Sequence, residues 1–222
     1  MNNMVYGSSS CWEQELTNLD DKLMACISSI MPEVVKKVFS NTKEKTITKR
    51  IVHYTRASKC LMEIGTLELE FELTQENRNG DITTKGFLDM ALFINPGNYE
   101  QYIAYECKRL NKISSSNGKR KSLAGLYVDE GIIRYITAQY SEKLPYGCMI
   151  GYVLDNDISF AKKQLHTAIR RRSKLIKLNN QTFLTRTTSS ILDNFLTTHN
   201  KHSMYSNFQI RHYLLAVNGN NT

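Results

Sequence analysis

The spacing of apolar side chains changes along this chain, and each change predicts a different element. Apolar residues recur every three or four positions over residues 12–38, which predicts one apolar stripe on a helix, or on two helices that meet at Pro32. A second helix is expected next, capped at Asn41 or Thr42 and stopped at Gly65. Such a stripe is normally core, and a docking face for a partner or a second copy is the alternative.

A strict alternation then replaces the helical spacing. In TLELEFEL, residues 66–73, apolar side chains alternate with glutamates, as in a half-buried strand. Two apolar runs follow, GFLDMALFI and YIAYECKRL, separated by the turn sequence NPGN. Further strands are expected at YGCMIGYVL, TFLTRT and FQIRHYLLAV, and helices at LYVDEGIIRYITAQYS and DISFAKKQLHTAIRRRSKLIKL. This order predicts an α/β (α+β mixed-sheet) protein, with helices packed around a central mixed sheet.

Charged residues interrupt the two apolar strands on either side of NPGN. Asp89 lies inside the first, and the second ends on Glu106 and Lys108. In an antiparallel hairpin centred between Gly97 and Asn98, Asp89 lies directly across from Glu106, with Cβ atoms roughly 4.5–5.5 Å apart. Lys108 projects from the same face, because side chains alternate along a strand. The pattern therefore predicts two carboxylates and an amine at one place.

Opposed carboxylates destabilise a sheet, and a buried carboxylate is costly unless it is paired or binds a metal. Lys108 supplies one positive charge. A divalent cation would satisfy both acids better, and oxygen ligands favour Mg²⁺, with Mn²⁺ as a substitute. The metal would activate a water, with Lys108 holding that water or neutralising charge on a phosphate. A plain ion cluster of Asp89, Glu106 and Lys108 is the alternative.

These residues resemble the PD-(D/E)xK nuclease superfamily, whose core is that of restriction endonucleases, and within it bacterial proteins found near phage-defence genes. The likeness rests on the acid in GFLDMALF, then YECKRL, YVDEGIIRYITAQY and GCMIGYVL, and it extends over residues 41–217. The superfamily's proline before the acid is Leu88 here. The resemblance implies that Asp89 and Glu106 hold Mg²⁺ and that Lys108 assists the hydrolytic water.

The resemblance also implies further acids and a domain plan. A helical glutamate before the first strand matches Glu44, and an acid on the first strand matches Glu70 or Glu72; Glu44 and Glu72 are the expected additional metal ligands. For Glu44, a first-turn acid favoured by the helix macrodipole is an equally open interpretation. The restriction-endonuclease-like domain is expected over residues 41–222, after an N-terminal helical extension over residues 1–40.

The charge balance favours an anionic partner. Lys and Arg number 29 against 21 Asp and Glu, a formal net charge of +8, which suits nucleic acid before a membrane surface. Two basic runs, residues 108–121 and 162–177, contain no acid, and ISSSNGKRKS within the first reads as a flexible loop along a nucleic-acid backbone. Arg134 meets a phosphate or the acids of the site, or else pairs with Glu130. The residues expected to contact nucleic acid are Arg109, Lys112, Lys119, Arg120, Arg134, Arg170 and Arg171.

Cysteine usage and the start of the chain bear on the compartment. The five cysteines are odd in number and show no CxxC spacing, which predicts reduced thiols in a cytoplasmic protein. We find no signal-peptide layout and no apolar run long enough to span a bilayer, so no membrane association is expected. His199 and His202 have only a weak metal spacing, and His212 is expected to be a strand residue with a structural hydrogen bond.

Two function classes follow. The first is a Mg²⁺-dependent endonuclease that hydrolyses phosphodiester bonds, in DNA ahead of RNA, as part of anti-phage defence. The second is a catalytically silent nuclease-fold subunit that binds nucleic acid or serves as a scaffold, with the N-terminal helices docking a protein partner or a second copy. The joint presence of Asp89, Glu106 and Lys108 favours the enzyme, because a scaffold has no need to retain all three.

Overall fold

The computed structural model describes residues 9–94, 102–113, 118–141, 144–179, 184–188, 191–201 and 207–218. The elements in chain order are α1 (Ser9–Val35), α2 (Glu44–Ala57), η1 (Lys59–Glu63), β1 (Thr66–Glu76), β2 (Ile82–Phe93), β3 (Tyr102–Arg109), β4 (Asn111–Ile113), β5 (Arg120–Ser122), α3 (Ala124–Leu126), η2 (Tyr127–Ile132), α4 (Ile133–Ile136), β6 (Tyr146–Val153), α5 (Ile158–Arg171), β7 (Leu184–Thr188), β8 (Leu192–His199) and β9 (Phe208–Ala216).

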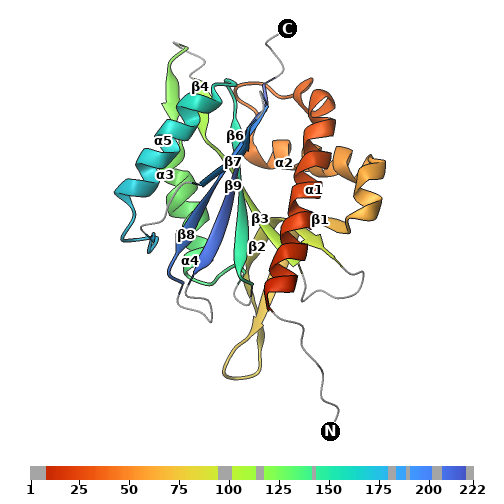
Figure 1. The fold of residues 1–222 in the computed structure, drawn as a ribbon, viewed down its shortest axis with the longest axis vertical. Helices are drawn as coiled ribbons and strands as arrows, with labels where there is room; N and C mark the ends of the chain where they lie inside the picture. The colour runs from red at the N-terminus through yellow and green to blue at the C-terminus, as the bar shows by residue number, and fades with distance from the viewer. Residues whose placement is uncertain are drawn as a thin grey trace.

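Seven of these strands form one mixed sheet in the order β1-β2-β3-β6-β9-β8-β7, and β4 and β5 form a separate two-stranded ribbon. β2 pairs antiparallel with both β1 and β3, whereas β3 pairs parallel with β6 and β6 pairs parallel with β9. Helices α1 and α2 cover one face, and α3, η2, α4 and α5 cover the other (Figure 1). The expected α/β class with a mixed sheet flanked by helices is confirmed.

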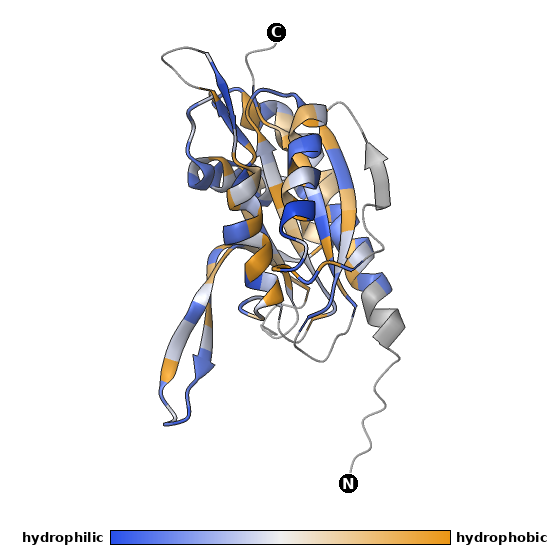
Figure 2. Ribbon diagram, turned by 90° about the vertical axis from the view of Figure 1, so that its left-hand side faces the viewer, coloured by the Kyte–Doolittle hydropathy of each residue, from blue (hydrophilic) through white to orange (hydrophobic). Residues whose placement is uncertain are grey.

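The β2–β3 hairpin positions the candidate site. Met90 pairs with Tyr105 in the register that places Asp89 across from Glu106, as the sequence predicts. The NPGN turn lies outside the described residues. Regular pairing of β2 with β3 ends at Met90, but β2 stays paired with β1 as far as Ile82, and the two strands form a long arm that leaves the body of the protein (Figure 2). The site therefore lies where β2 departs from β3.

Helix α1 is part of the main core. It runs as one helix through Pro32, near its last turn, and its side chains Leu23, Ile27 and Val34 are fully buried against the sheet. The apolar stripe expected over residues 12–38 is therefore core where its side chains are described, and these buried residues are not a free docking surface. No helix among the described residues is long and apolar enough to cross a membrane.

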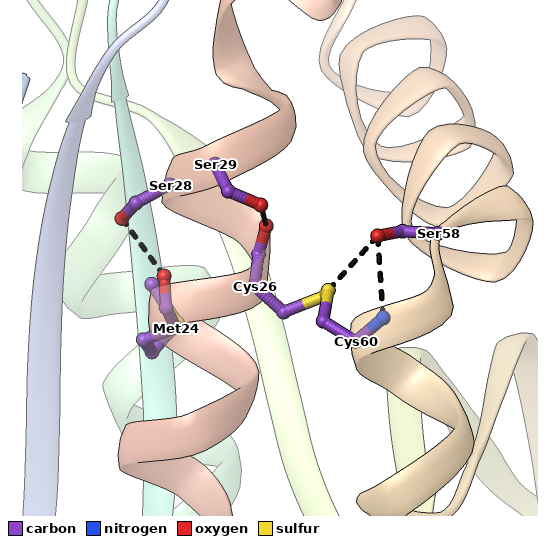
Figure 3. The surroundings of a disulfide bond; sticks show 6 residues. All are labelled: Met24, Cys26, Ser28, Ser29, Ser58 and Cys60. Carbon is purple, nitrogen blue, oxygen red and sulfur yellow. Dashed lines mark hydrogen bonds between the residues drawn. A yellow bond between two sulfur atoms is a disulfide. The ribbon is translucent and has the colours of Figure 1, made fainter.

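A disulfide ties α1 to the segment that follows α2. Cys26 of α1 and Cys60 of η1 are bonded, with Cα atoms 5.8 Å apart, and the Ser58 hydroxyl lies 3.0 Å from the Cys60 sulfur (Figure 3). The expectation of reduced thiols is therefore wrong for this pair. The two cysteines are 34 residues apart and meet only because two helical segments pack together, which their spacing in the sequence does not indicate. Cys107 and Cys148 are free and buried.

Strand β8 and the β4–β5 ribbon were not expected from the sequence. The inward side chains of β8 are Asp193, Phe195, Thr197 and His199, so the buried face is mostly polar and shows no apolar alternation. Hydrogen bonds from other elements satisfy these groups; Lys162 Nζ, for example, lies 2.8 Å from an oxygen of Asp193. The ribbon comes from the segment interpreted as a flexible loop, which is too polar to carry a strand signal.

Candidate active site

The site forms where β3 has lost β2 as a neighbour. Backbone N–H groups two residues apart on a strand point to the same side, so those of Cys107 and Arg109 face the gap that β2 leaves. Cys107 N donates to Asp89 Oδ2 at 2.7 Å, and Arg109 N donates to Glu44 Oε2 at 2.7 Å. Two carboxylates, from β2 and from the first turn of α2, thus take the place of the missing strand.

A third carboxylate, that of Glu106, lies between two cations and is fully buried. Lys108 Nζ lies 2.6 Å from Glu106 Oε1 and 3.3 Å from Glu44 Oε1, so it bridges the two glutamates. On the other side, Arg134 Nη1 lies 3.0 and 3.3 Å from the two oxygens of Glu106. The structure therefore brings together Asp89, Glu106, Lys108, Glu44 and Arg134.

The charges of Lys108 and Arg134 do not fully offset the cost of burying the carboxylates of the site. Burial, together with the neighbouring Asp89, raises the pKa of Glu106 to about 7, although Lys108 and Arg134 oppose this shift. Burial also raises the pKa of Asp89. Burial lowers the pKa of Lys108, but Glu106 and Glu44 outweigh it and hold that pKa above its usual value. Lys108 therefore stays protonated. The raised pKa values of Glu106 and Asp89 mean that an added cation would stabilise their ionised forms.

The donor chemistry fits a hard divalent cation. Asp89 Oδ2 is taken by the backbone, and among the described residues its Oδ1 has no hydrogen-bond donor. Mg²⁺ commonly binds through one or two carboxylates and keeps several waters, which suits Asp89 and Glu106 as its protein ligands. The described residues contain no group of three or more His, Cys, Asp or Glu side chains placed to hold a metal. A cation here would therefore rely on water for much of its coordination.

The acids expected from β1 lie outside this cluster. Glu72 is exposed, and its Oε1 accepts a hydrogen bond from the Thr84 hydroxyl on the neighbouring strand. Glu70 falls opposite Asp89 in the β1–β2 register, but its side chain is exposed and pairs with Lys45. Glu70 also has a positive φ of 53°, which locally breaks the regular strand. The structure therefore does not bring Glu72 to the site as a metal ligand.

Arg134 contacts an acid of the site rather than its helical neighbour. Among the described residues it makes no ion pair with Glu130, and its Nη1 donates to the Tyr140 hydroxyl at 2.6 Å as well as to Glu106. That hydroxyl donates in turn to the carbonyl oxygen of Phe87 on β2. Tyr140 therefore fixes Arg134 against Glu106. Sequence reasoning missed this role, because Tyr140 lies six residues after Arg134 and helical periodicity does not connect the two.

Gly131 allows the helix that carries Arg134 to approach the sheet. A Cβ atom at this position would lie 2.4 Å from Met149 Cε on β6 and 3.7 Å from Glu106 Cγ on β3. The turn around it is a π-helix, Tyr127–Ile132, a widened geometry that is frequent at functional sites. The close approach to the YECKRL strand expected for Gly131 is present, and its tightest contact is on β6.

The basic residues expected to contact nucleic acid occupy different places. Arg109 reaches the carbonyl oxygen of Thr42, with 3.4 Å between the atoms, and lies beside the site. Lys112 and Lys119 are exposed in the ribbon segment. Arg170 and Arg171 are exposed in the last turn of α5, which begins beside the ribbon and runs roughly 20 Å away from it.

Comparisons with family models, with curated proteins and with solved structures found no match for this chain.

Proposed function

We propose that this protein is a metal-dependent nuclease that hydrolyses phosphodiester bonds, DNA ahead of RNA, with a restriction-endonuclease-like fold. The observation that carries the proposal is the cluster of Asp89, Glu106, Glu44 and Lys108 at the point where β3 loses its neighbour. Three carboxylates gather there around β3: Asp89 and Glu44 accept from backbone N–H groups of the strand, and Lys108 lies between Glu44 and Glu106. Burial, and after it the charge of Asp89, raises the pKa of Glu106 to about 7, and a divalent cation would offset both causes.

The order of elements supports the fold part of the proposal. The strand with Asp89 precedes and pairs with the strand that carries YECKRL, a helical segment with Gly131 and Arg134 follows, and the MIGY strand then lies parallel to β3. This is the sequence of motifs on which the resemblance to PD-(D/E)xK nucleases rests. Assignment to the cytoplasm and to anti-phage defence rests on that resemblance and on composition alone, and the Cys26–Cys60 disulfide runs against the reduced thiols that composition predicts.

The residues have distinct roles in the proposed reaction. A bound Mg²⁺ would supply a polarised water and neutralise charge on the phosphate. Asp89 and Glu106 would hold that ion, while the charge of Lys108, whose Nζ donates to Glu106, Glu44 and the carbonyl oxygen of Cys107, would neutralise charge on the phosphate. Arg134 acts as a positioning residue, because its two contacts to Glu106 fix that carboxylate. Glu44 holds Lys108 and the backbone of Arg109 in place.

Cleavage assays test the proposal. Wild type, Asp89→Ala and Lys108→Ala are incubated with supercoiled plasmid and with single-stranded DNA and RNA, in Mg²⁺, Mn²⁺ or EDTA. We expect metal-dependent cleavage by the wild type and a loss of at least about 100-fold in each variant, the scale of removing a group that acts in the transition state. Cleavage that persists unchanged in both variants contradicts the assignment of the site.

One observation favours a second function, a catalytically silent nuclease-fold subunit that binds nucleic acid or serves as a scaffold. Glu106 is already paired with both Lys108 and Arg134, as in a closed ion network. The same assay separates the two functions. Binding of nucleic acid without cleavage in any metal, by a protein that is folded and monodisperse, supports the silent subunit.

A further inference from the structure

The β4–β5 ribbon has two chemically different faces. On one face Asn111 pairs with Ser122, and Ile113 pairs with Arg120. Asn111 is buried, Ile113 and Ser122 are half-buried, and Arg120 forms ion pairs with the body of the protein. Lys112 pairs with Lys121 on the opposite face, and both are exposed. The ribbon stands at one end of the molecule, beside the start of α5 (Figure 1).

The inward face is fastened to the body by acids that follow β6. Arg120 forms ion pairs with Asp155 and with Asp157, the latter at 2.9 Å, and its guanidinium lies 4.4 Å from the centre of the Phe160 ring. Asn111 donates to Asp155 and accepts from the N–H of Leu154 at 2.8 Å. Arg120, expected to contact nucleic acid, therefore orients the ribbon instead.

The outward face is left with like charges. Lys112 and Lys121 lie directly opposite each other, an arrangement that destabilises a β-ribbon in isolation. Neither forms an ion pair within the described part of the chain, where many other basic side chains do. Such a face is stabilised by an anionic partner with closely spaced charges.

The position of the ribbon points to the substrate of the proposed site. Lys112 is four residues after Lys108, so the ribbon continues directly from the strand that carries the cluster. Single-strand binding proteins stack bases on aromatic side chains, and residues 111–122 contain none. A two-stranded ribbon, by contrast, fits the major groove of double-stranded DNA, and lysines suit its phosphates.

We propose that the outward face of the β4–β5 ribbon, with Lys112 and Lys121 at its centre, binds the phosphate backbone of double-stranded DNA beside the Asp89–Glu106–Lys108 cluster. The inference rests on the proposed nuclease function for its choice of substrate. Arg120 acts as a positioning residue that holds the ribbon in the orientation that binding requires.

Binding measured in EDTA tests the ribbon without cleavage. Fluorescence anisotropy gives the Kd of wild type, Lys112→Gln/Lys121→Gln and a control, Lys22→Gln/Lys59→Gln, for a labelled duplex and for one of its strands. The control removes the same charge from two exposed positions away from the ribbon. At 100 mM salt we expect the ribbon variant to bind duplex at least about 10-fold more weakly, with a salt slope reduced by about 1.8, or 0.9 per phosphate contact. Circular dichroism confirms that both variants are folded.

Several outcomes overturn the proposal. These are duplex binding by the ribbon variant equal to that of the wild type, equal losses in the ribbon and control variants, an equal loss for the single strand, or no duplex binding by the wild type. Plasmid cleavage measured in parallel keeps the two proposals apart. Ribbon-dependent duplex binding without cleavage in any metal supports the proposed DNA contact of the ribbon and contradicts the proposed nuclease activity. Cleavage that does not depend on the ribbon supports the nuclease activity and contradicts the DNA contact.

Discussion

Asp20 and Glu106 are both fully buried carboxylates, but their surroundings differ in kind. Asp20 accepts hydrogen bonds from the hydroxyls of Tyr105 and Tyr213, at 2.7 and 2.6 Å, and pairs with Arg211. Its donors come from β3 and β9 and match its charge, so it docks α1 on the sheet. Glu106 is paired with Lys108 and Arg134, and after burial the charge of Asp89 is the largest cause that raises its pKa.

Removing Asp20 should destabilise the fold strongly. Asp20→Ala leaves the buried guanidinium of Arg211 without its fully buried partner, which costs about 3–5 kcal/mol of unfolding free energy. Asp21→Ala is the matched control, because that carboxylate also contacts Arg211 but is 56% exposed, and we expect a loss below about 1 kcal/mol. Urea unfolding measures both. Similar losses in the two variants contradict the role given to Asp20.

Buried histidines should make the protein sensitive to acid. His199 Nδ1 lies 2.8 Å from the carbonyl oxygen of Ile176 and must donate to it, so Nε2 accepts from Thr197, whose oxygen accepts in turn from His212. Burial lowers the pKa of His199 from 6.5 to about 4. Between pH 6.5 and pH 4, His199 is therefore protonated in the unfolded chain but neutral in the folded chain. The free energy of unfolding falls as the pH drops through this range.

The size of this effect can be measured. Between pH 7 and pH 4.5 the contribution of His199 falls by about 2.5 kcal/mol, at 1.36 kcal/mol for each unit of pKa difference. Urea unfolding of wild type and His199→Gln at both pH values gives the difference. The variant is expected to be less stable at pH 7 but to lose about 2.5 kcal/mol less than the wild type on acidification. An equal loss in both proteins refutes the assignment.

At the scale of elements, the gap between β2 and β3 determines where the candidate site forms. A regular sheet satisfies its own N–H groups, whereas here Asp89 and Glu44 satisfy those of Cys107 and Arg109. Helix α2 supplies Glu44, so its placement matters for the site. The disulfide between Cys26 and Cys60 ties the segment after α2 to α1 and thereby restrains that helix at its other end.

Breaking the disulfide should lower stability without abolishing folding. A cross-link that closes a loop of 34 residues contributes up to about 4 kcal/mol through the entropy of the unfolded chain. We therefore expect Cys60→Ser, or wild type with reductant, to lose up to about 4 kcal/mol in urea unfolding. Cys60→Ser with reductant is the internal control. A wild type whose stability does not respond to reductant argues against a bond between these cysteines.

At the scale of the whole molecule, the sequence pattern predicts those features that depend only on the period of one element or on the register of two adjacent strands. The alternation in TLELEFEL, the apolar runs and the NPGN turn were enough to predict the β2–β3 pairing and to place Asp89 across from Glu106. Three other features depend on packing between distant segments and carry no local signal. These are the polar buried face of β8, the pairing of Cys26 with Cys60, and the contact of Tyr140 with Arg134.

The sequence also does not show which of two expected metal ligands, Glu44 or Glu72, lies at the site. Glu72 and Glu44 were both expected as metal ligands, and only three-dimensional placement separates them. Glu44 lies 3.3 Å from Lys108 Nζ, whereas Glu72 contacts Thr84 on the exposed side of the β1–β2 arm. The strand period predicts that Glu72 projects from one face of β1, but it does not predict where the arm leaves the sheet.

The difference in position between Glu44 and Glu72 tests the proposed active site. The rate of Mg²⁺-dependent plasmid cleavage is measured for wild type, Glu44→Gln, Glu106→Gln and Glu72→Gln under identical conditions. We predict that the rate falls at least about 100-fold in Glu106→Gln and changes by less than about 2-fold in Glu72→Gln. Glu44→Gln is expected to lose about 10–100-fold, because Glu44 contacts Lys108 and so positions it. Full activity in Glu106→Gln, or equal losses in Glu44→Gln and Glu72→Gln, would contradict the site described here.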